Sequence, residues 1–253
     1  MNTSTKQQLM TPSTTNRLIV ALDVETAREA LNLFNTLKTV AGMFKVGSQL
    51  FTSEGPGVVR EIIGAGGRVF LDLKFHDIPN TVAAAGVEAT RLGVSIFNVH
   101  ACGGQEMMRR TAEAVSETAL REGIPRPHVI GVTVLTSSDE TTLAEAGFSS
   151  GAEEQVKRLA RLTSASGLDG VVASPHEVRL VREAVGQPGF LIVTPGVRPK
   201  GTALDDQRRV MTPAEAQQAG ADYLVVGRAI LKASDPARAA HEIIEEMEKS
   251  SGQ

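Results

Sequence analysis

Short, nearly continuous apolar runs alternate with longer amphipathic segments from Arg17 to the C-terminus. The runs are rich in β-branched residues, which is typical of parallel strands that are buried on both faces. The segments between them carry apolar residues at helical spacing. The predicted strands are Leu18–Val24, Met43–Ser48, Arg68–Phe75, Val94–Ala101, His128–Leu135, Gly170–Ser174, Phe190–Gly196 and Tyr223–Ile230.

The starts of several predicted helices are marked by residues that favour helix N-termini. At three places a Ser or Thr stands three residues before a Glu, which is the spacing of a capping box. At three places a proline occupies the first helical position. The capping pairs are Thr26–Glu29, Ser174–Glu177 and Thr212–Glu215, and the prolines are Pro175, Pro213 and Pro236.

Eight strand–helix units predict a single-domain (β/α)8 TIM barrel over residues 17–253, with the active site at the C-terminal ends of the strands. A doubly wound open sheet is the alternative, but no G-x-G-x-x-G follows the first strand, which weakens its dinucleotide-binding version. The polar residues 1–16 are predicted to form a flexible tail. The longest loop, residues 136–151, follows the fifth strand, on the face where such barrels carry their chemistry.

Composition narrows the classes of protein further. The 253 residues are 42 % apolar with a net charge of −3, which does not favour nucleic acid as a partner. A single cysteine excludes an intrachain disulfide and a multi-cysteine zinc site, and makes a reducing cytoplasmic location the default. No signal peptide and no apolar run of 18 residues are present, so no membrane association is expected.

Charged residues interrupt the apolar pattern at the ends of the first three predicted strands: Asp23, Lys45, Asp72, Lys74 and, just beyond, Asp77. Side chains alternate along a strand, so Asp72 and Lys74 share one face, which we expect to point into the barrel. Asp23 and Lys45 come from neighbouring strands at a similar height. Acids and bases buried together in a barrel mouth must pair, because an unpaired buried ion costs several kcal/mol.

Two interpretations of this charge cluster remain open. It could be a structural ion-pair network that closes the end of the barrel. A catalytic role is favoured by its position at the C-terminal strand ends and by the presence of lysine, which can act as a proton donor.

The last two predicted strands end in segments that suit a phosphate group. Gly227 and Arg228 follow the eighth strand, and Arg198 follows the seventh, where many barrels bind phosphate. Glycine lets the backbone approach an anion, and arginine donates two charge-assisted hydrogen bonds. The alternative is a turn glycine beside a solvated arginine.

At these residues the sequence resembles the orotidine 5′-phosphate decarboxylase family. The segment VFLDLKFHDIPNT carries the pattern D-x-K-x-x-D-[IV]-x-x-T in full, at Asp72, Lys74, Asp77, Ile78 and Thr81. The resemblance continues in order along the chain with LIVALDV around Asp23, FKVG around Lys45, VTVLTS around Thr136, VTPGVRP around Arg198, DQRR around Gln207 and VVGRAI around Gly227 and Arg228.

This resemblance implies an activity. Members of the family convert orotidine 5′-phosphate to uridine 5′-phosphate and CO₂, the last step of de novo pyrimidine nucleotide synthesis. They use no metal or organic cofactor and act as homodimers. The same properties are expected of this chain, with a small-molecule substrate and a copy of itself as partners.

The resemblance also implies roles for individual residues. Lys45, Asp72 and Lys74 would form the catalytic charge network with Asp77 of the partner subunit, and Lys74 would protonate C6 of the pyrimidine. The substrate-binding residues would be Asp23 and Lys45 at the ribose, Asp72 near the departing carboxylate, Thr81 from across the dimer interface, Thr136 at the pyrimidine, and Arg198, Gln207, Gly227 and Arg228 at the phosphate.

Two other functions share parts of this pattern. Related metal-dependent barrels that act on sugar phosphates also carry D-x-K-x-x-D, but the Ile78–Thr81 continuation and Gln207 argue against them. A non-catalytic nucleotide-binding protein would be expected to have lost a member of the charge network, and here all are present.

Overall fold

The computed structural model describes residues 17–199 and 211–251. The predicted tail, residues 1–16, and Gln207 lie outside the described residues. In the described part, parallel strands close into a barrel in the order β1 to β8, which confirms the predicted TIM barrel. The strands are β1 (Leu18–Ala21), β2 (Met43–Gly47), β3 (Val69–Phe75), β4 (Ile96–His100), β5 (His128–Val132), β6 (Gly170–Val172), β7 (Leu191–Pro195) and β8 (Tyr223–Val226).

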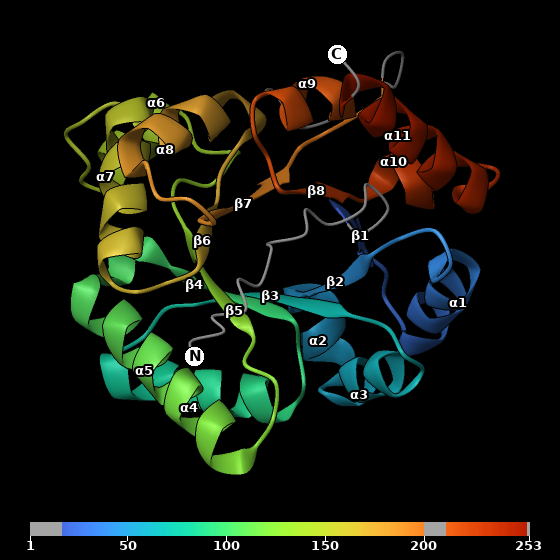
Figure 1. Cartoon of the computed structure of the whole chain (residues 1–253), viewed down its shortest axis with the longest axis horizontal. Helices are drawn as coiled ribbons and strands as arrows, with labels where there is room; N and C mark the ends of the chain where they lie inside the picture. Colours follow the sequence, from blue (N-terminus) through green and yellow to red (C-terminus); the bar gives the residue numbers. More distant parts are fainter. Residues whose placement is uncertain (1–16, 200–210, 252–253) are drawn as a thin grey trace, which may run out of the picture.

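The helices surround these strands on the outside (Figure 1). They are α1 (Ala27–Leu37), α2 (Ser48–Glu54), α3 (Gly57–Gly64), α4 (Pro79–Arg91), α5 (Gln105–Glu122), α6 (Glu140–Glu145), α7 (Ala152–Ala165), α8 (Val178–Val185), α9 (Pro213–Gln218), α10 (Arg228–Leu231) and α11 (Pro236–Ser251). None of the described helices is both long and apolar enough to cross a membrane.

The predicted caps form at the helix starts. The Thr26 hydroxyl accepts from the backbone N–H of Glu29. Thr212 and Glu215 make the full reciprocal box, with the Glu215 N–H donating to the Thr212 hydroxyl and the Glu215 carboxylate accepting from the Thr212 N–H. These boundaries are decided by contacts between residues only three positions apart in the sequence, so the sequence predicts them well.

Several predicted boundaries differ from those in the structure: the first strand ends at Ala21 rather than Val24, and the fifth ends at Val132 rather than Leu135. Two further differences are informative. The segment 136–151 is not a loop throughout, because Asp139 caps α6 by accepting from the N–H and the hydroxyl of Thr142. The eighth strand ends at Val226 rather than Ile230. An apolar run there continues into the short helix α10, and hydrophobicity alone does not distinguish a buried strand from a buried helix.

The core has two layers. The inner layer fills the barrel with the inward-facing side chains Ile19, Ala21, Met43, Phe70, Ile96, Ile130, Val193, Tyr223 and Val225. The outer, larger layer packs the opposite strand faces against the helices. Burial on both faces explains the continuous apolar runs in the sequence.

An ion pair at the N-terminal end of the barrel joins neighbouring strands. The Asp169 carboxylate, just before β6, accepts from Arg126 at 2.8 Å and from the backbone N–H of Val129 at 2.7 Å. Burial acts to raise the pKa of Asp169, but the nearby His128 imidazole, the hydrogen bond from the Val129 N–H and the charge of Arg126 outweigh it, so the pKa lies below its ordinary value. The ionised carboxylate is therefore the form that stabilises the fold.

Asp169→Asn is expected to lower the free energy of unfolding at pH 7 by about 1–3 kcal/mol, because a partly buried charge-assisted pair is lost. A depressed pKa in the folded state gives stability that is present above the unfolded pKa and is lost as the pH falls through the folded pKa. The difference between the two proteins should therefore shrink below about pH 4. Urea unfolding at fixed protein concentration across this range measures it, with the exposed, weakly paired Glu154→Gln as the matched control. A pH-independent difference would contradict the electrostatic explanation.

Candidate active site

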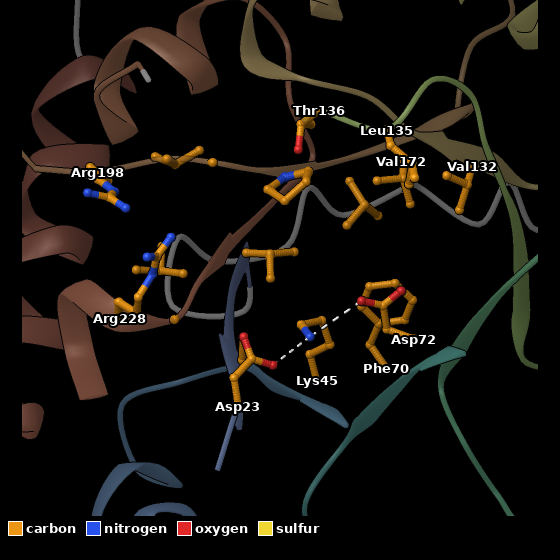
Figure 2. Close-up of a pocket in the computed structure, with 18 of the residues that line it drawn as sticks. Asp23, Lys45, Phe70, Asp72, Val132, Leu135, Thr136, Val172, Arg198 and Arg228 are labelled. Atoms are coloured by element: carbon orange, nitrogen blue, oxygen red, sulfur yellow. Dashed lines mark hydrogen bonds and ion pairs between the residues drawn. The ribbon is translucent and has the colours of Figure 1, made fainter. Parts of the chain in front are cut away.

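A cavity of about 260 Å³ opens at the C-terminal ends of the strands. Figure 2 shows its charged residues reaching in from different strands, with apolar side chains between them. The lining includes Asp23, Lys45, Phe70, Asp72, Lys74, Val132, Leu135, Thr136, Val172, Val193, Arg198, Val225, Gly227 and Arg228. Eight sequence-predicted site residues therefore meet in one cavity, although they come from six different strand ends.

The charged residues form a chain of alternating sign along one wall. The Lys45 ammonium lies 2.9 Å from Asp23 Oδ1 and 3.4 Å from Asp72 Oδ2. The Lys74 ammonium lies 2.6 Å from Asp72 Oδ1. The Asp72 carboxylate thus bridges the two lysines, and each positive group faces a negative one.

Burial and pairing act in opposite directions on these groups. Burial alone would lower the pKa of Lys45, but the charges of Asp72 and Asp23 outweigh it and raise the pKa. Burial alone would raise the pKa of Asp72, but Lys45, Lys74 and a hydrogen bond from Asn98 outweigh it and lower the pKa. Both groups are thus held in their charged forms, and the network presents fixed charges to the cavity.

Exposure differs along the network in a way that matters for chemistry. The Lys45 and Asp72 side chains are only 12 % exposed, whereas the Lys74 side chain is 34 % exposed. Lys74 is therefore the cation of this network that a bound molecule can contact most directly. The Asp72 carboxylate, itself paired with the buried Lys45 ammonium, holds the Lys74 ammonium in place.

The Lys74 side chain points into the cavity as predicted, but not through the regular alternation of side chains along a strand. Lys74 has φ of 51°, and among the described residues it is the one non-glycine with a positive φ. Its strand bulges there: Leu71 pairs with Phe97 and Phe75 with Val99, so three residues of β3 oppose one of β4. A left-handed conformation costs a lysine about 1–2 kcal/mol, and such strain concentrates at functional sites.

Sequence reasoning missed two residues that support this network. Asn98, fully buried on β4, hydrogen-bonds both Asp72 and the backbone of Lys74. Gly47, opposite Asp72 on β2, leaves space for Lys45, because a Cβ there would lie 3.1 Å from the Lys45 ammonium. A buried polar residue inside a predicted apolar strand was the signal for Asn98.

The opposite end of the cavity is rich in positive charge. Arg198, just after β7, is only 7 % exposed, and Arg228 opens α10 directly after Gly227. Figure 2 shows the two arginines at one end of the cavity, with Asp72 toward the other. Arginine side chains beside a glycine and a helix start make a suitable place for a phosphate group.

Asp77 and Thr81 lie elsewhere. Both are exposed, and neither lines the cavity. Asp77 follows β3, and its carboxylate accepts from the backbone N–H of Ile78, whose large apolar side chain is 67 % exposed. Asp77, Ile78 and Thr81 thus form an exposed surface with both polar and apolar side chains, which is available for contact with another chain.

Within residues 17–199 and 211–251, no three His, Cys, Asp or Glu side chains are grouped closely enough to hold a metal ion. The two carboxylates of the cavity, Asp23 and Asp72, are directed at lysine ammonium groups instead.

These observations describe a (β/α)8 barrel whose cavity joins a lysine–aspartate network to an arginine-rich end, the architecture of many barrel enzymes. The chain belongs to the orotidine 5′-phosphate decarboxylase / HUMPS family, whose model matches residues 16–243.

Comparison with individual proteins agrees with this assignment. The chain is 58 % identical over 231 residues to an orotidine 5′-phosphate decarboxylase of Geobacter sulfurreducens, covering 91 % of this chain and 95 % of the relative. It is 53 % identical over 243 residues to that of Moorella thermoacetica, covering 96 % of each. Among solved structures, the orotidine 5′-phosphate decarboxylase of Lactobacillus acidophilus superimposes with a TM-score of 0.80 at 36 % identity, covering 91 % of this chain and 98 % of that one.

Proposed function

We propose that this protein decarboxylates orotidine 5′-phosphate to uridine 5′-phosphate and CO₂ in the cytoplasm, as the last step of pyrimidine nucleotide synthesis. The observation that carries the proposal is the ion pair between the Lys74 ammonium and the Asp72 carboxylate. This ion pair lines the same cavity as Arg198 and Arg228, which lie at the opposite end. The identity to curated decarboxylases over nearly the whole chain supports the same activity.

The reaction demands stabilisation of a poorly delocalised carbanion. When the bond from C6 to the carboxylate breaks, its electron pair stays in an sp² orbital on C6, with no adjacent carbonyl to form an enolate. We assign no cofactor to this step, so fixed protein charges must supply the stabilisation. The Lys74 ammonium stabilises the developing charge, then gives C6 a proton and is reprotonated from solvent.

The other network residues hold Lys74 and the ribose. Asp72 fixes the ammonium and lies near the departing carboxylate, and Lys45 keeps Asp72 ionised. Asp23 and Lys45, joined at 2.9 Å, are placed to bind ribose hydroxyls. Thr136, across the cavity in Figure 2, binds the pyrimidine edge.

The phosphate is assigned to the arginine-rich end of the cavity. Arg198 and Arg228 donate charge-assisted hydrogen bonds, and Gly227 lets the backbone approach. Gln207, which lies outside the described residues, is assigned to the phosphate by its match to the family motif.

We also propose a homodimer in which Asp77 and Thr81 complete the site of the partner subunit. The exposed positions of these two residues, away from their own chain's cavity, support this arrangement. The neighbouring Ile78, 67 % exposed, supplies apolar surface that a partner would cover.

The activity is tested by following the pyrimidine absorbance of orotidine 5′-phosphate with purified protein in excess EDTA. Metal-independent turnover is the expected result. Absence of turnover under these conditions, with activity on a sugar phosphate restored by Mg²⁺, would instead indicate the metal-dependent branch of the family. Tight binding without turnover would indicate a nucleotide-binding protein.

The shared site is tested by mixing two inactive variants, Lys74→Ala and Asp77→Ala. Random exchange of subunits makes half of the dimers mixed, and in each mixed dimer one of two sites has both native residues. About one quarter of wild-type activity should return after co-refolding, because each subunit of an isologous dimer can complete the other's site. No recovery, with mixed dimers present by mass spectrometry, would show that Asp77 does not act across the interface.

A further inference from the structure

Asn98 connects the two residues of the reaction centre from a position with no solvent exposure. Its side chain extends inward from β4, and the residue is fully buried. The amide oxygen accepts from the backbone N–H of Lys74 at 2.8 Å, and the amide nitrogen donates to Asp72 Oδ1 at 2.7 Å. One side chain thus holds the backbone of the lysine and the carboxylate that binds its ammonium.

The β3–β4 pairing shows why such a bridge is needed. Regular pairing stops after Leu71 and resumes at Phe75, so the three residues between them oppose Asn98 alone. In this gap the Asn98 side chain takes the place of a strand carbonyl as acceptor for Lys74. The left-handed backbone of Lys74 lies within the same gap.

The two hydrogen bonds require a side chain that accepts at one atom and donates at another. A backbone N–H needs an acceptor and a carboxylate needs a donor, so only one orientation of the amide satisfies both. Alanine would supply neither group. An ionised aspartate would keep the acceptor but place a negative oxygen against Asp72.

We infer that Asn98 is a positioning residue of the reaction centre. It holds Lys74 in the left-handed conformation and orients Asp72, so that the ammonium stays on the carboxylate and is directed at the substrate. Asn98 acts through these two residues rather than by touching the substrate. This inference rests on the proposed decarboxylase function, because its readout is the reaction that Lys74 performs.

The first test compares Asn98→Ala with Val99→Ala, its buried neighbour on the outer face of β4. Asn98→Ala is expected to lower kcat by about 10²-fold, as small misplacements of reacting groups do. Its affinity for uridine 5′-phosphate should change by less than about threefold, that is by well under 1 kcal/mol. Val99→Ala should lose thermal stability but keep kcat, which separates positioning from general weakening of the strand.

The second test uses the isosteric Asn98→Asp and a pH profile. Desolvation and the facing Asp72 carboxylate raise the pKa of the introduced carboxyl. Once protonated, it can donate to Asp72 and accept from the Lys74 N–H, as the amide does. The ratio of variant to wild-type kcat should therefore rise as the pH falls, whereas a merely structural role predicts a flat ratio.

Other titratable or charged groups surround Asn98, and this is why the test uses the ratio of variant to wild-type kcat. Lys45 lies beyond Asp72 on β2, and His100 lies two residues along on β4, against His76. Burial, and the charges of His76 and Lys74, lower the pKa of His100. These groups are present in both proteins, so the ratio removes the part of their titration that the substitution leaves unchanged. The residue opposite on β5 is the apolar Ile130.

The outcomes separate this inference from the proposed function. If wild-type protein does not turn over orotidine 5′-phosphate, the proposed function fails. If wild type is active and Asn98→Ala keeps its kcat, or the Asn98→Asp ratio does not change with pH, Asn98 is structural only. If Asn98→Ala does not fold, the pH dependence of the Asn98→Asp kcat ratio distinguishes a positioning role from a structural one.

Discussion

Lys74→Ala is expected to lower kcat for orotidine 5′-phosphate by at least about 10⁴-fold, because one group supplies both the proton and the nearest positive charge. General acid catalysis alone contributes about 10²–10⁴-fold, and removing a preorganised donor costs a further 10²–10³-fold. The loss should fall on kcat, since the carbanion exists only along the reaction path. The measurement is the pyrimidine absorbance change under saturating substrate with EDTA.

Lys38→Ala is the matched control for this change. Lys38 follows α1, outside the cavity, and its ammonium donates to the side-chain oxygen of Asn35 and lies over the Phe34 ring. It should leave kcat unchanged. If Lys74→Ala retained a tenth or more of wild-type kcat, Lys74 could not be the proton donor.

Orotidine without its phosphate is expected to react with a kcat/KM about 10²–10⁶-fold lower than that of orotidine 5′-phosphate. Two or three charge-assisted hydrogen bonds to the phosphate, each worth about 1.5–3 kcal/mol, correspond to this range at 1.4 kcal/mol per tenfold. The phosphate is remote from C6, so its binding energy can raise kcat only by being used to organise the site. Added phosphite should therefore partly restore the reaction of orotidine.

Arg228→Ala provides the matched comparison. It should slow the reaction of orotidine 5′-phosphate by about 10–10²-fold, through the loss of one charged hydrogen bond, while orotidine itself reacts as with wild type. Phosphite should no longer help the variant. Similar kcat/KM values for orotidine and its phosphate in the wild type would refute the role of this end of the cavity.

The sequence determined much of this protein by itself. Eight apolar runs predicted the barrel because strands buried on both faces must be apolar, whatever their neighbours. Charges at the ends of those runs predicted most of the site for the same reason, since Asp23, Lys45 and Asp72 would be unfavourable there without partners. Thr26 and Thr212 marked helix starts because capping is a local interaction.

Only the tertiary structure decided how Lys74 reaches the cavity. Alternation along the strand predicts an inward lysine, but the observed side chain depends on a bulge and a left-handed backbone at Lys74. That conformation is held by Asn98, a residue 24 positions away, on a different strand. Likewise, the space at Gly47 matters only because Lys45 and Asp23 meet beside it. Periodicity and capping reflect preferences of residues that are close in sequence. Contacts between strands depend on their register in the closed barrel, so the supporting roles of Asn98 and Gly47 could be recognised only in the tertiary structure.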